Sequence, residues 1–306
     1  MNSNLNGILC VDKPAGFTSF DVIAKLRGIL KMKRLGHAGT LDPMATGVLP
    51  VFVGYATKAC GILPNEDKIY IAEFQLGKIS DTQDSTGKIL ETHDFTGISK
   101  QDILDSVPTG EIMQIPPMYS AVSVNGKRLY ELAREGKEIE RQARPVSIKL
   151  VYCTGINPET GKGTLEIHCG KGTYVRTLIH DMGKTLGCGA VMTNLRRSYA
   201  SGFALNSCYS LEQIQEFADK NNISKIIIPI EKAFSSLPVV NLNVKQTKLY
   251  RNGVKLDLSQ FAINFKSQQY AVYGTDGFLG TALPDLEQNC LRIERNLCEP
   301  LHRNEV

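Results

Sequence analysis

The 306-residue chain lacks several features that mark specialised classes of protein. Its eight cysteines include no C-x-x-C pair, so the sequence favours neither a zinc site nor a disulfide framework, and we expect buried, reduced thiols. No apolar run approaches the length of a membrane span, and the polar first residues lack the basic and apolar regions of a signal peptide. We therefore expect a cytoplasmic protein with no metal and no membrane partner.

The chain also lacks a strong excess of charge of either sign, since 35 basic and 31 acidic residues leave a net charge of only +4. A value this small does not by itself indicate a nucleic-acid partner. The distribution is less even: residues 1–60 carry 7 basic and 3 acidic groups, residues 61–118 carry 4 and 10, and residues 119–207 carry 13 and 7. A polyanion would favour the two basic windows, although solvated faces of alternating sign are the commoner cause of such swings.

The apolar residues, 42% of the chain, are enough for a large core, and their spacing indicates both strands and helices. Strands are expected at residues 7–11, 48–53, 69–76, 146–152 and 163–169. Helices are expected from Thr18 or Ser19, from Ser99, within 127–144, and over about 174–186, 211–219 and 244–251. Because these elements do not alternate strictly as βαβ units, the expected fold class is α+β.

The sequence predicts two domains of unequal size. After the Ser-Ser-Leu-Pro stretch at 235–238, the pattern changes to short strands and turn signals with one small helix. We expect a larger α+β domain at residues 1–236 and a small, mostly-β module at 237–306. Within the first, the basic segment at about 119–146 has an Asn-Gly hairpin turn at 125–126 and has the character of an exposed arm.

The densest group of residues that could carry chemistry is the loop GHAGTLDPMATG at 36–47. Asp42 stands between a Gly-Thr turn and a proline, so its carboxylate is held on a loop where the backbone can approach a ligand closely. Aspartate before proline is also an ordinary turn starter. Spacing alone therefore leaves both a catalytic and a purely structural Asp42 open.

A second group is KGTYVR at 171–176, a Gly-Thr turn that opens a helix with Thr173 as its expected N-cap. Arg176 lies two residues inside that helix, where a cation is unfavourably placed against the helix dipole. This position suggests that Arg176 pairs with a buried carboxylate. An arginine that simply reaches solvent is the alternative.

These loops belong to a series of segments that together resemble one family. GHAGTLDPMATGVLPV at 36–51 closely resembles the catalytic signature of the TruB branch of pseudouridine synthases. Five further segments resemble the other conserved blocks of that family and occur in the same order: VDKPAGFTS (11–19), KIYIAEFQLG (68–77), PPMYSAVSVNGKRLYELAREG (116–136), KGTYVRTLIHDMG (171–183) and LRRSYASGF (195–203). The resemblance implies the pseudouridine-synthase fold, a mixed and largely antiparallel sheet flanked by helices, and an isomerase that needs no cofactor.

Carried over residue by residue, the resemblance implies a catalytic group. Asp42 matches the family's nucleophile, and Arg176 matches the arginine that pairs with it. Tyr70 matches the aromatic stacking residue, and its hydroxyl could also take the proton from C5 of uracil. For Tyr70, packing with one hydrogen bond is the plain structural alternative.

The resemblance also implies a set of substrate-binding residues. Tyr174 and Leu195 match positions that line the uracil pocket, and His37 matches the residue that packs into the RNA where the target nucleotide leaves. The arm at 119–146 matches an insertion that closes on the T-loop of tRNA. Its expected phosphate contacts are Lys127, Arg128, Arg134 and Arg141.

The implied reaction is the isomerisation of uridine to pseudouridine at position 55 of tRNA, after the base has flipped into a pocket. The expected partner is tRNA, bound by its T-loop and T-stem to a monomer with no obligate protein partner. The module at 237–306 resembles a PUA-type domain only weakly, so it either binds the acceptor stem or is degenerate and packs on the catalytic domain. Two other functions stay open: a tRNA-binding folding factor on the same scaffold, and a guide-RNA-dependent synthase, which would need segments that this compact chain lacks.

Overall fold

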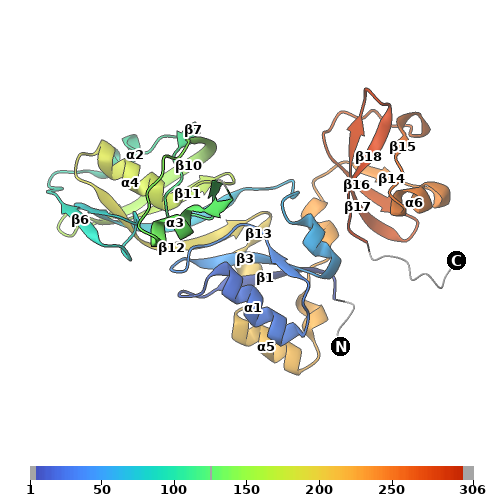
Figure 1. The fold of residues 1–306 in the computed structure, drawn as a ribbon, viewed down its shortest axis with the longest axis horizontal. Coiled ribbons are helices and arrows are strands. Elements are labelled where there is room, and N and C mark those ends of the chain that lie inside the picture. The colour runs from blue at the N-terminus through green and yellow to red at the C-terminus, as the bar shows by residue number, and fades with distance from the viewer. Residues whose placement is uncertain (1–4, 125, 299–306) are drawn as a thin grey trace.

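A computed structural model describes residues 5–124 and 126–298, which contain one large β-sheet, one smaller β-sheet and two two-stranded sheets, with the large and the smaller sheet in separate parts of the molecule (Figure 1). The large sheet has nine strands. Its main path runs through β1 (Gly7–Lys13), β3 (Thr46–Val53), β12 (Ala190–Ala200), β4 (Lys68–Leu76), β11 (Lys162–Cys169), β10 (Arg144–Ile156) and β7 (Gly110–Gln114). Two short strands, β2 (Leu35–His37) and β13 (Phe203–Ala204), pair with β3 and β12. Only the β12–β3 pairing in this sheet is parallel, so the predicted mixed, largely antiparallel α+β fold is confirmed.

Capping explains where most of the helices begin. At the start of α1 (Ser19–Leu30), the Thr18 side chain accepts a hydrogen bond from the Asp21 backbone N–H, and the Asp21 carboxylate accepts one from the Thr18 N–H. Such a reciprocal cap stabilises a helix by about 1 kcal/mol. The same arrangement starts α2 (Lys100–Asp105) at Ser99, α5 (Leu211–Asp219) at Ser210 and α6 (Val244–Arg251) at Asn243. The helix starts predicted at Thr18 and Ser99 are therefore confirmed.

Helix α4 (Val175–Thr185) begins differently from the prediction. Its N-cap is Tyr174 rather than Thr173, whose hydroxyl instead donates to the Gly170 carbonyl at 3.3 Å. The side chain of Gln114 in β7 accepts from the Tyr174 N–H at 2.8 Å and donates to the Tyr174 carbonyl at 3.1 Å. The predicted Thr173 cap is wrong because a distant glutamine, invisible to local pattern, fixes the start of this helix.

Two apolar clusters fill the space between the large sheet and its helices. Helices α1 and α5 pack on the β1–β3 end, where Leu26 and Ile214 are completely buried. Helix α4 packs over β4, β11 and β12, where Ile179 and Phe74 are completely buried. Truncating one such side chain to alanine costs about 2–5 kcal/mol. Each cluster thus holds one half of the sheet in place.

The smaller sheet has its own core. It consists of β14 (Val239–Asn241), β16 (Tyr270–Gly274), β17 (Gly277–Asp285), β18 (Cys290–Asn296) and β15 (Leu256–Asp257), in that spatial order. Tyr250 of α6 is fully buried against it and donates its hydroxyl proton to the Thr281 carbonyl at 3.0 Å. Phe278 stacks on Phe234 of the larger part, with ring centres 5.8 Å apart. The mostly-β character of the C-terminal module is confirmed.

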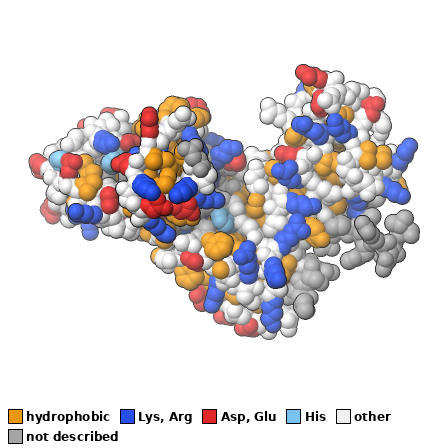
Figure 2. All heavy atoms as spheres, in the orientation of Figure 1, with side chains coloured by type: hydrophobic (Ala, Val, Ile, Leu, Met, Phe, Trp, Pro, Cys, Tyr) orange, Lys and Arg blue, Asp and Glu red, His pale blue; other side chains and the backbone are white. Residues whose placement is uncertain are grey.

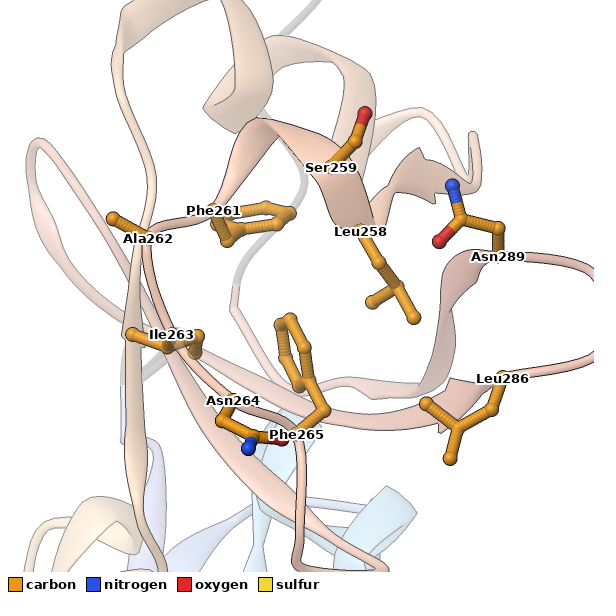
Figure 3. A pocket seen from close by; sticks show the side chains of 9 residues that line it. All are labelled: Leu258, Ser259, Phe261, Ala262, Ile263, Asn264, Phe265, Leu286 and Asn289. Carbon is orange, nitrogen blue, oxygen red and sulfur yellow. The ribbon is translucent and has the colours of Figure 1, made fainter.

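A shallow pocket lies in this module, away from the large sheet (Figure 3). Its lining is Leu258, Ser259, Phe261, Ala262, Ile263, Asn264, Phe265, Leu286 and Asn289. These side chains are mainly apolar and carry no acid or base. The pocket has no groups for the chemistry that the sequence predicts.

Two further expectations concern cysteine and membranes. All eight thiols are free, and five are buried, but Cys60, Cys208 and Cys298 are only partly covered. Across residues 5–124 and 126–298, no helix combines the length and apolar character needed to cross a membrane.

Candidate functional site

The loop between β2 and β3 carries Asp42 and is anchored on both sides of it. The Leu41 N–H donates to the Ser19 hydroxyl at 2.9 Å, at the first residue of α1. The Pro43 carbonyl accepts from the Gly16 N–H at 2.8 Å. Because its two neighbours are held by the turn and helix that follow β1, the Asp42 carboxylate is presented from a fixed backbone.

Lys13, which sequence reasoning passed over, lies beneath the same loop. It is completely buried and donates from Nζ to the carbonyl oxygens of Pro14 at 2.9 Å and Pro43 at 3.2 Å. Burial lowers the pKa of Lys13 to about 8, while the negative charge of Asp42 acts in the opposite direction. The lysine thus stabilises the turn and, when protonated, adds positive charge near Asp42.

Arg176 contacts Asp42 directly, as the reading of its helix position suggested. Its Nη2 lies 2.9 Å from Asp42 Oδ1 and also 2.9 Å from the carbonyl oxygen of Tyr119. The Arg176 side chain is 6% exposed and that of Asp42 31%, so the carboxylate still faces open space. Burial raises the pKa of Asp42 and Arg176 opposes that rise, so the guanidinium is the main support for the charged form.

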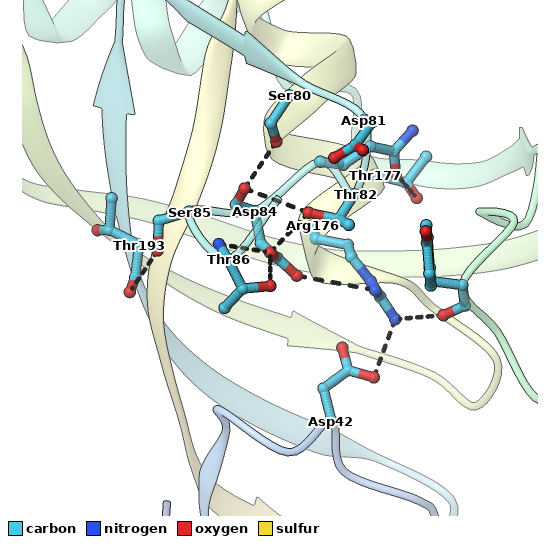
Figure 4. Close-up of polar contacts among 12 residues, drawn as sticks. Asp42, Ser80, Asp81, Thr82, Asp84, Ser85, Thr86, Arg176, Thr177 and Thr193 are labelled. Carbon is cyan, nitrogen blue, oxygen red and sulfur yellow. Dashed lines mark hydrogen bonds and ion pairs between the residues drawn. The ribbon is translucent and has the colours of Figure 1, made fainter. Parts of the chain in front are cut away.

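A second carboxylate, Asp84, lies on the other side of Arg176 (Figure 4). Asp84 is 4% exposed, and its Oδ2 is 3.8 Å from Arg176 Nη1. Its Oδ1 accepts hydrogen bonds from the Thr82 hydroxyl at 2.8 Å and from the Thr86 N–H and hydroxyl at 2.9 and 2.6 Å. Arg176 is therefore held between two acids, of which only Asp42 is partly open to solvent.

The turn that carries Asp84 is fixed to its surroundings by the residue before it. Gln83 adopts a left-handed φ of 67°, which is strained for a residue with a side chain. Its side-chain oxygen accepts from the Thr177 hydroxyl at 2.7 Å, and its carbonyl accepts from the Met192 N–H at 3.2 Å. Helix α4 and strand β12 thus hold Asp84 where it meets Arg176. Sequence reasoning missed this acid, and its only signal was the Ser/Thr/Asp-rich segment at 80–86.

Tyr70 and Leu195 lie on adjacent strands of the sheet, two residues apart in register, because Tyr70 is opposite Arg197 and Leu195 is opposite Ala72. Tyr70 belongs to β4 and Leu195 to the adjacent β12, and both share an apolar cluster with Leu41. Their exposures are only 6% and 5%. Burial raises the pKa of the Tyr70 hydroxyl, and Arg197 acts against that rise. These two residues form an apolar floor next to Asp42.

His37 and Tyr174 are both half-buried and lie at the margins of this region. His37 ends β2, where it pairs with Val51 of β3, and burial lowers the pKa of its ring, with Arg197 acting in the same direction. An uncharged imidazole follows at neutral pH. Among the described contacts, neither side chain forms a hydrogen bond with Asp42.

The arm is built from β8 (Ser123–Val124), β9 (Lys127–Arg128) and α3 (Leu129–Arg134). The two strands pair as the predicted hairpin, with Val124 opposite Lys127, while Asn125 itself lies outside the described residues. Figure 2 shows basic and acidic side chains mixed over this part of the surface. The arm is exposed, as predicted, but is less uniformly basic than its arginines suggested.

The four predicted phosphate contacts on the arm differ in what surrounds them. Lys127, Arg128 and Arg134 are exposed. Lys127 Nζ is 3.9 Å from Glu135 Oε1, an acid of the arm itself. Arg141 is partly buried and pairs with Glu138 at 2.9 Å. The structure therefore brings Asp42 and Arg176 into contact, whereas Lys127 and Arg141 pair with acids of the arm itself.

Comparison with protein-family models matches two of them. One, described as TruB family pseudouridylate synthase (N terminal domain), matches residues 27–175. The other, described as tRNA pseudouridylate synthase B C-terminal domain, matches residues 176–235. Together they span more than half of the chain.

Curated proteins of the same description match over nearly the whole length. tRNA pseudouridine synthase B of Clostridioides difficile is 40% identical over 297 residues, which are 95% of this chain and 98% of that protein. The Clostridium kluyveri protein of the same name is 43% identical over 272 residues, 88% of this chain and 92% of that protein.

Solved structures show the same fold. A chain in the crystal structure of a Cbf5-Nop10-Gar1 complex superposes with a TM-score of 0.74 at 25% identity, covering 96% of this chain and 85% of that one. A chain of an H/ACA RNP bound to a substrate RNA containing 2'-deoxyuridine superposes with a TM-score of 0.72 at 23% identity, covering 96% and 86%.

Proposed function

The chain belongs to the TruB family of pseudouridylate synthases and is a tRNA-modifying isomerase, and from this premise we propose that it acts on uridine 55 in the T-loop, with Asp42 as nucleophile. The observation that carries the proposal is the 2.9 Å contact between Asp42 and the buried Arg176, on a loop that keeps the carboxylate accessible.

The reaction breaks the bond from ribose to N1 of uracil, turns the ring and joins the ribose to C5. It involves neither a redox step nor net hydrolysis. Asp42 must be ionised to act as a nucleophile, and its buried surroundings oppose ionisation. Arg176 stays charged inside a protein and offsets that cost. One carboxylate suffices both for attack at C6 of the ring and for assistance to elimination at the ribose.

The target base would leave the RNA stack and enter the space above Tyr70 and Leu195. Extracting a nucleotide costs a few kcal/mol of lost stacking. Stacking on the Tyr70 ring returns roughly 1–3 kcal/mol. Tyr174 would line the same pocket, and His37, uncharged at neutral pH, would pack into the vacated place in the RNA.

Phosphate contacts would come from the arm and from the neighbouring basic surface. Figure 2 shows mainly basic side chains over α1 and over the short helix η1 (Gly54–Ala59). We assign residues 1–236 to the catalytic domain, with the arm at 119–146, and residues 237–306 to a PUA-like RNA-binding module. The T-loop and T-stem of tRNA would contact the catalytic domain, and the acceptor stem would contact the PUA-like module. We expect the protein to act as a monomer in the cytoplasm.

The test is the substitution Asp42→Asn, which keeps the shape of the side chain and removes its charge. We expect pseudouridine formation at position 55 to fall by at least about a thousandfold in single turnover, with tRNA affinity within a few-fold of the starting protein. Asp219→Asn is the matched control, since Asp219 is an exposed acid at the end of α5. Modified uridines are mapped in tRNA from both reactions.

Normal turnover by Asp42→Asn would rule out the nucleophile. If the unaltered protein bound tRNA well and left every uridine unmodified, a folding factor on the same scaffold would be the better description. Modification of a uridine other than 55 would overturn the proposed position alone.

A further inference from the structure

A completely buried arginine, Arg197, lies beneath the loop that carries Asp42. In the sheet it is paired with Tyr70 of β4 on one side and with Gly47 of β3 on the other. A Cβ on Gly47 would lie 2.2 Å from the Arg197 carbonyl oxygen, and Gly47 has a φ of 101°, so only glycine permits this approach. The arginine is thus fixed between the strand of Tyr70 and the strand that follows the catalytic loop.

Two of the three guanidinium nitrogens of Arg197 hold the loop. Nε donates to the Val48 carbonyl at 2.7 Å, and Nη2 donates to the Gly39 carbonyl at 2.9 Å. These two carbonyls lie on opposite sides of Asp42 in the chain. The two hydrogen bonds therefore fix the Asp42 loop both before and after the residue that carries the carboxylate.

The third nitrogen, Nη1, is buried and has no hydrogen-bond partner among the described residues. No ion pair between Arg197 and a carboxylate is present in that part of the chain either, in contrast to the neighbouring Arg196, which pairs with Asp12 at 2.8 Å. A buried cation without a counter-charge is costly to keep. Its free N–H and its charge are available to a group that becomes negative during the reaction.

Tyr70, the cross-strand partner of Arg197, is a group beside this charge that can become negative. The Arg197 guanidinium carbon lies 6.0 Å from the centre of the Tyr70 ring. Burial raises the pKa of the Tyr70 hydroxyl, and the nearby Cys169 and Asp42 raise it further. The positive charge of Arg197 acts in the opposite direction and lowers the pKa of the Tyr70 hydroxyl. Of these surrounding groups, Arg197 is the one that favours the phenolate.

We propose that Arg197 is a positioning residue with two linked tasks: it fixes the Asp42 loop through Gly39 and Val48, and it stabilises Tyr70 as the phenolate that takes the proton from C5. This rests on the proposed function. In that step the C5–H bond breaks and the proton passes to the Tyr70 oxygen. The electron pair of the C5–H bond forms the C5–C6 double bond as C6 gives up either its bond to Asp42, whose carboxylate takes the released pair, or its double bond to N1, whose nitrogen takes it. N1 gains a proton from water in the course of the reaction and Tyr70 returns the C5 proton to water, so the net change moves one proton from C5 to N1.

The direct test measures the ionisation of Tyr70 without any turnover. A 3-fluorotyrosine placed at position 70 is titrated by fluorine NMR in the full chain, alone and with Arg197→Met or Arg197→Lys. We expect Arg197→Met to move the titration upward by roughly one to two pH units, as for the loss of one charge at this separation. Arg197→Lys keeps the positive charge and is the more conservative variant in case Arg197→Met does not fold. It should raise the pKa of the fluorotyrosine at position 70 by less than Arg197→Met does.

Arg196→Met is the matched control, because Arg196 is the adjacent arginine on the same strand and pairs with Asp12 instead. It should leave the titration at position 70 unchanged. A second readout is the pH dependence of single-turnover pseudouridine formation. In Arg197→Lys the rate should fall at neutral pH and recover as the pH rises, because a higher Tyr70 pKa moves the rising limb to higher pH.

An unchanged titration at position 70 in both Arg197 variants, with lowered melting temperatures, would show that Arg197 only stabilises the fold and would overturn the proposal. The two proposals fail separately. If Asp42→Asn kept full turnover, the proposed function would fall whatever the fluorine titration showed, whereas a normal loss of turnover with an unmoved titration would remove only the role of Arg197.

Discussion

The charges around Asp42 and those of the arm come from the same residue types but lie in opposite surroundings. Arg176 is almost fully buried and has a fixed partner on each side, Asp42 and Asp84. On the arm, Lys127 and Lys137 are 60% and 63% exposed and share the single acid Glu135. One region has charges whose positions are set by the fold, and the other has charges free to exchange partners.

The difference follows from the solvent around each group. Two opposite charges 4 Å apart attract by about 4 kcal/mol at the effective dielectric near a protein and by about 1 kcal/mol in water. Exposed pairs of the arm's kind contribute about 0–1 kcal/mol each. The arm can therefore trade its internal pairs for phosphates at little cost, whereas separating Arg176 from Asp42 would leave a buried charge unpaired. Tyr119, whose carbonyl accepts from Arg176, joins the two regions at the base of the arm.

The largest effect outside Asp42 itself is expected at Arg176, because the comparison depends on its fixed contacts. Arg176→Lys keeps the charge, but one ammonium cannot reach Asp42, the Tyr119 carbonyl and Asp84 together. We expect single-turnover pseudouridine formation to fall roughly 100- to 1,000-fold with little change in melting temperature. Rapid-quench kinetics and calorimetry on the same protein measure the two quantities.

The control for this substitution is Arg144→Lys, a change of the same type at an exposed position at the start of β10. It should alter neither rate nor melting temperature. If Arg176→Lys lowered the rate and the melting temperature in proportion, Arg176 would be a structural residue. The contrast between fixed charges at the site and mobile charges on the arm would then not be supported.

A smaller effect is expected at Asp84, the second acid beside Arg176. Asp84→Asn keeps an oxygen for Thr82 and Thr86 but removes a negative charge. The charge of Asp84 raises the pKa of Asp42, so its removal should lower that pKa and move the acid limb of the pH–rate profile to lower pH. We also expect the maximal rate to fall roughly tenfold, because Arg176 loses one of the two carboxylates that hold its guanidinium in place.

The matched control is Asp81→Asn, in the same turn but exposed to solvent. Its pH–rate profile should coincide with that of the unaltered protein. An acid limb that moved upward in Asp84→Asn, or did not move at all, would show that the charge of Asp84 does not raise the pKa of Asp42.

Local signals explain how much of the fold was predictable. The capping pairs at Thr18 and Ser99 and the alternation along β4 are properties of a few neighbouring residues, so they predicted elements within a residue or two. The start of α4 was different, because Gln114, 60 residues away in the chain, decides it. A contact between two segments that are far apart in the chain cannot be recognised from the residue pattern of either segment alone.

The same reasoning applies to the site. Asp42 and Arg176 were candidates because each has an unusual place in its own segment, a carboxylate on a glycine-rich loop and a cation near a helix start, and the family resemblance then implied their roles. Asp84 and Arg197 carry no such local anomaly. Asp84 is one acid among several in a polar turn, and Arg197 is one of two adjacent arginines, so only the tertiary structure distinguishes the buried one.

The smallest predicted effect tests the arm's side of the comparison. Glu135→Gln removes the acid that Lys127 and Lys137 share, which should free both cations for phosphate. We expect tRNA affinity to rise about two- to threefold at low salt, with the gain lost at high salt. Lys127→Ala should act in the opposite direction and flatten the dependence of log affinity on log salt by about 0.9.

Neither arm variant should alter the rate at which bound tRNA is modified, and Glu159→Gln, at an exposed acid in the turn between β10 and β11, is the matched control for affinity. Filter binding over a salt series and single-turnover rates at saturating enzyme separate the two quantities. Should Glu135→Gln slow the modification of bound tRNA, the arm's internal ion pairs would be setting substrate geometry. The arm would then behave like the buried site, and exposure would no longer distinguish charges that position the substrate from charges that only attract it.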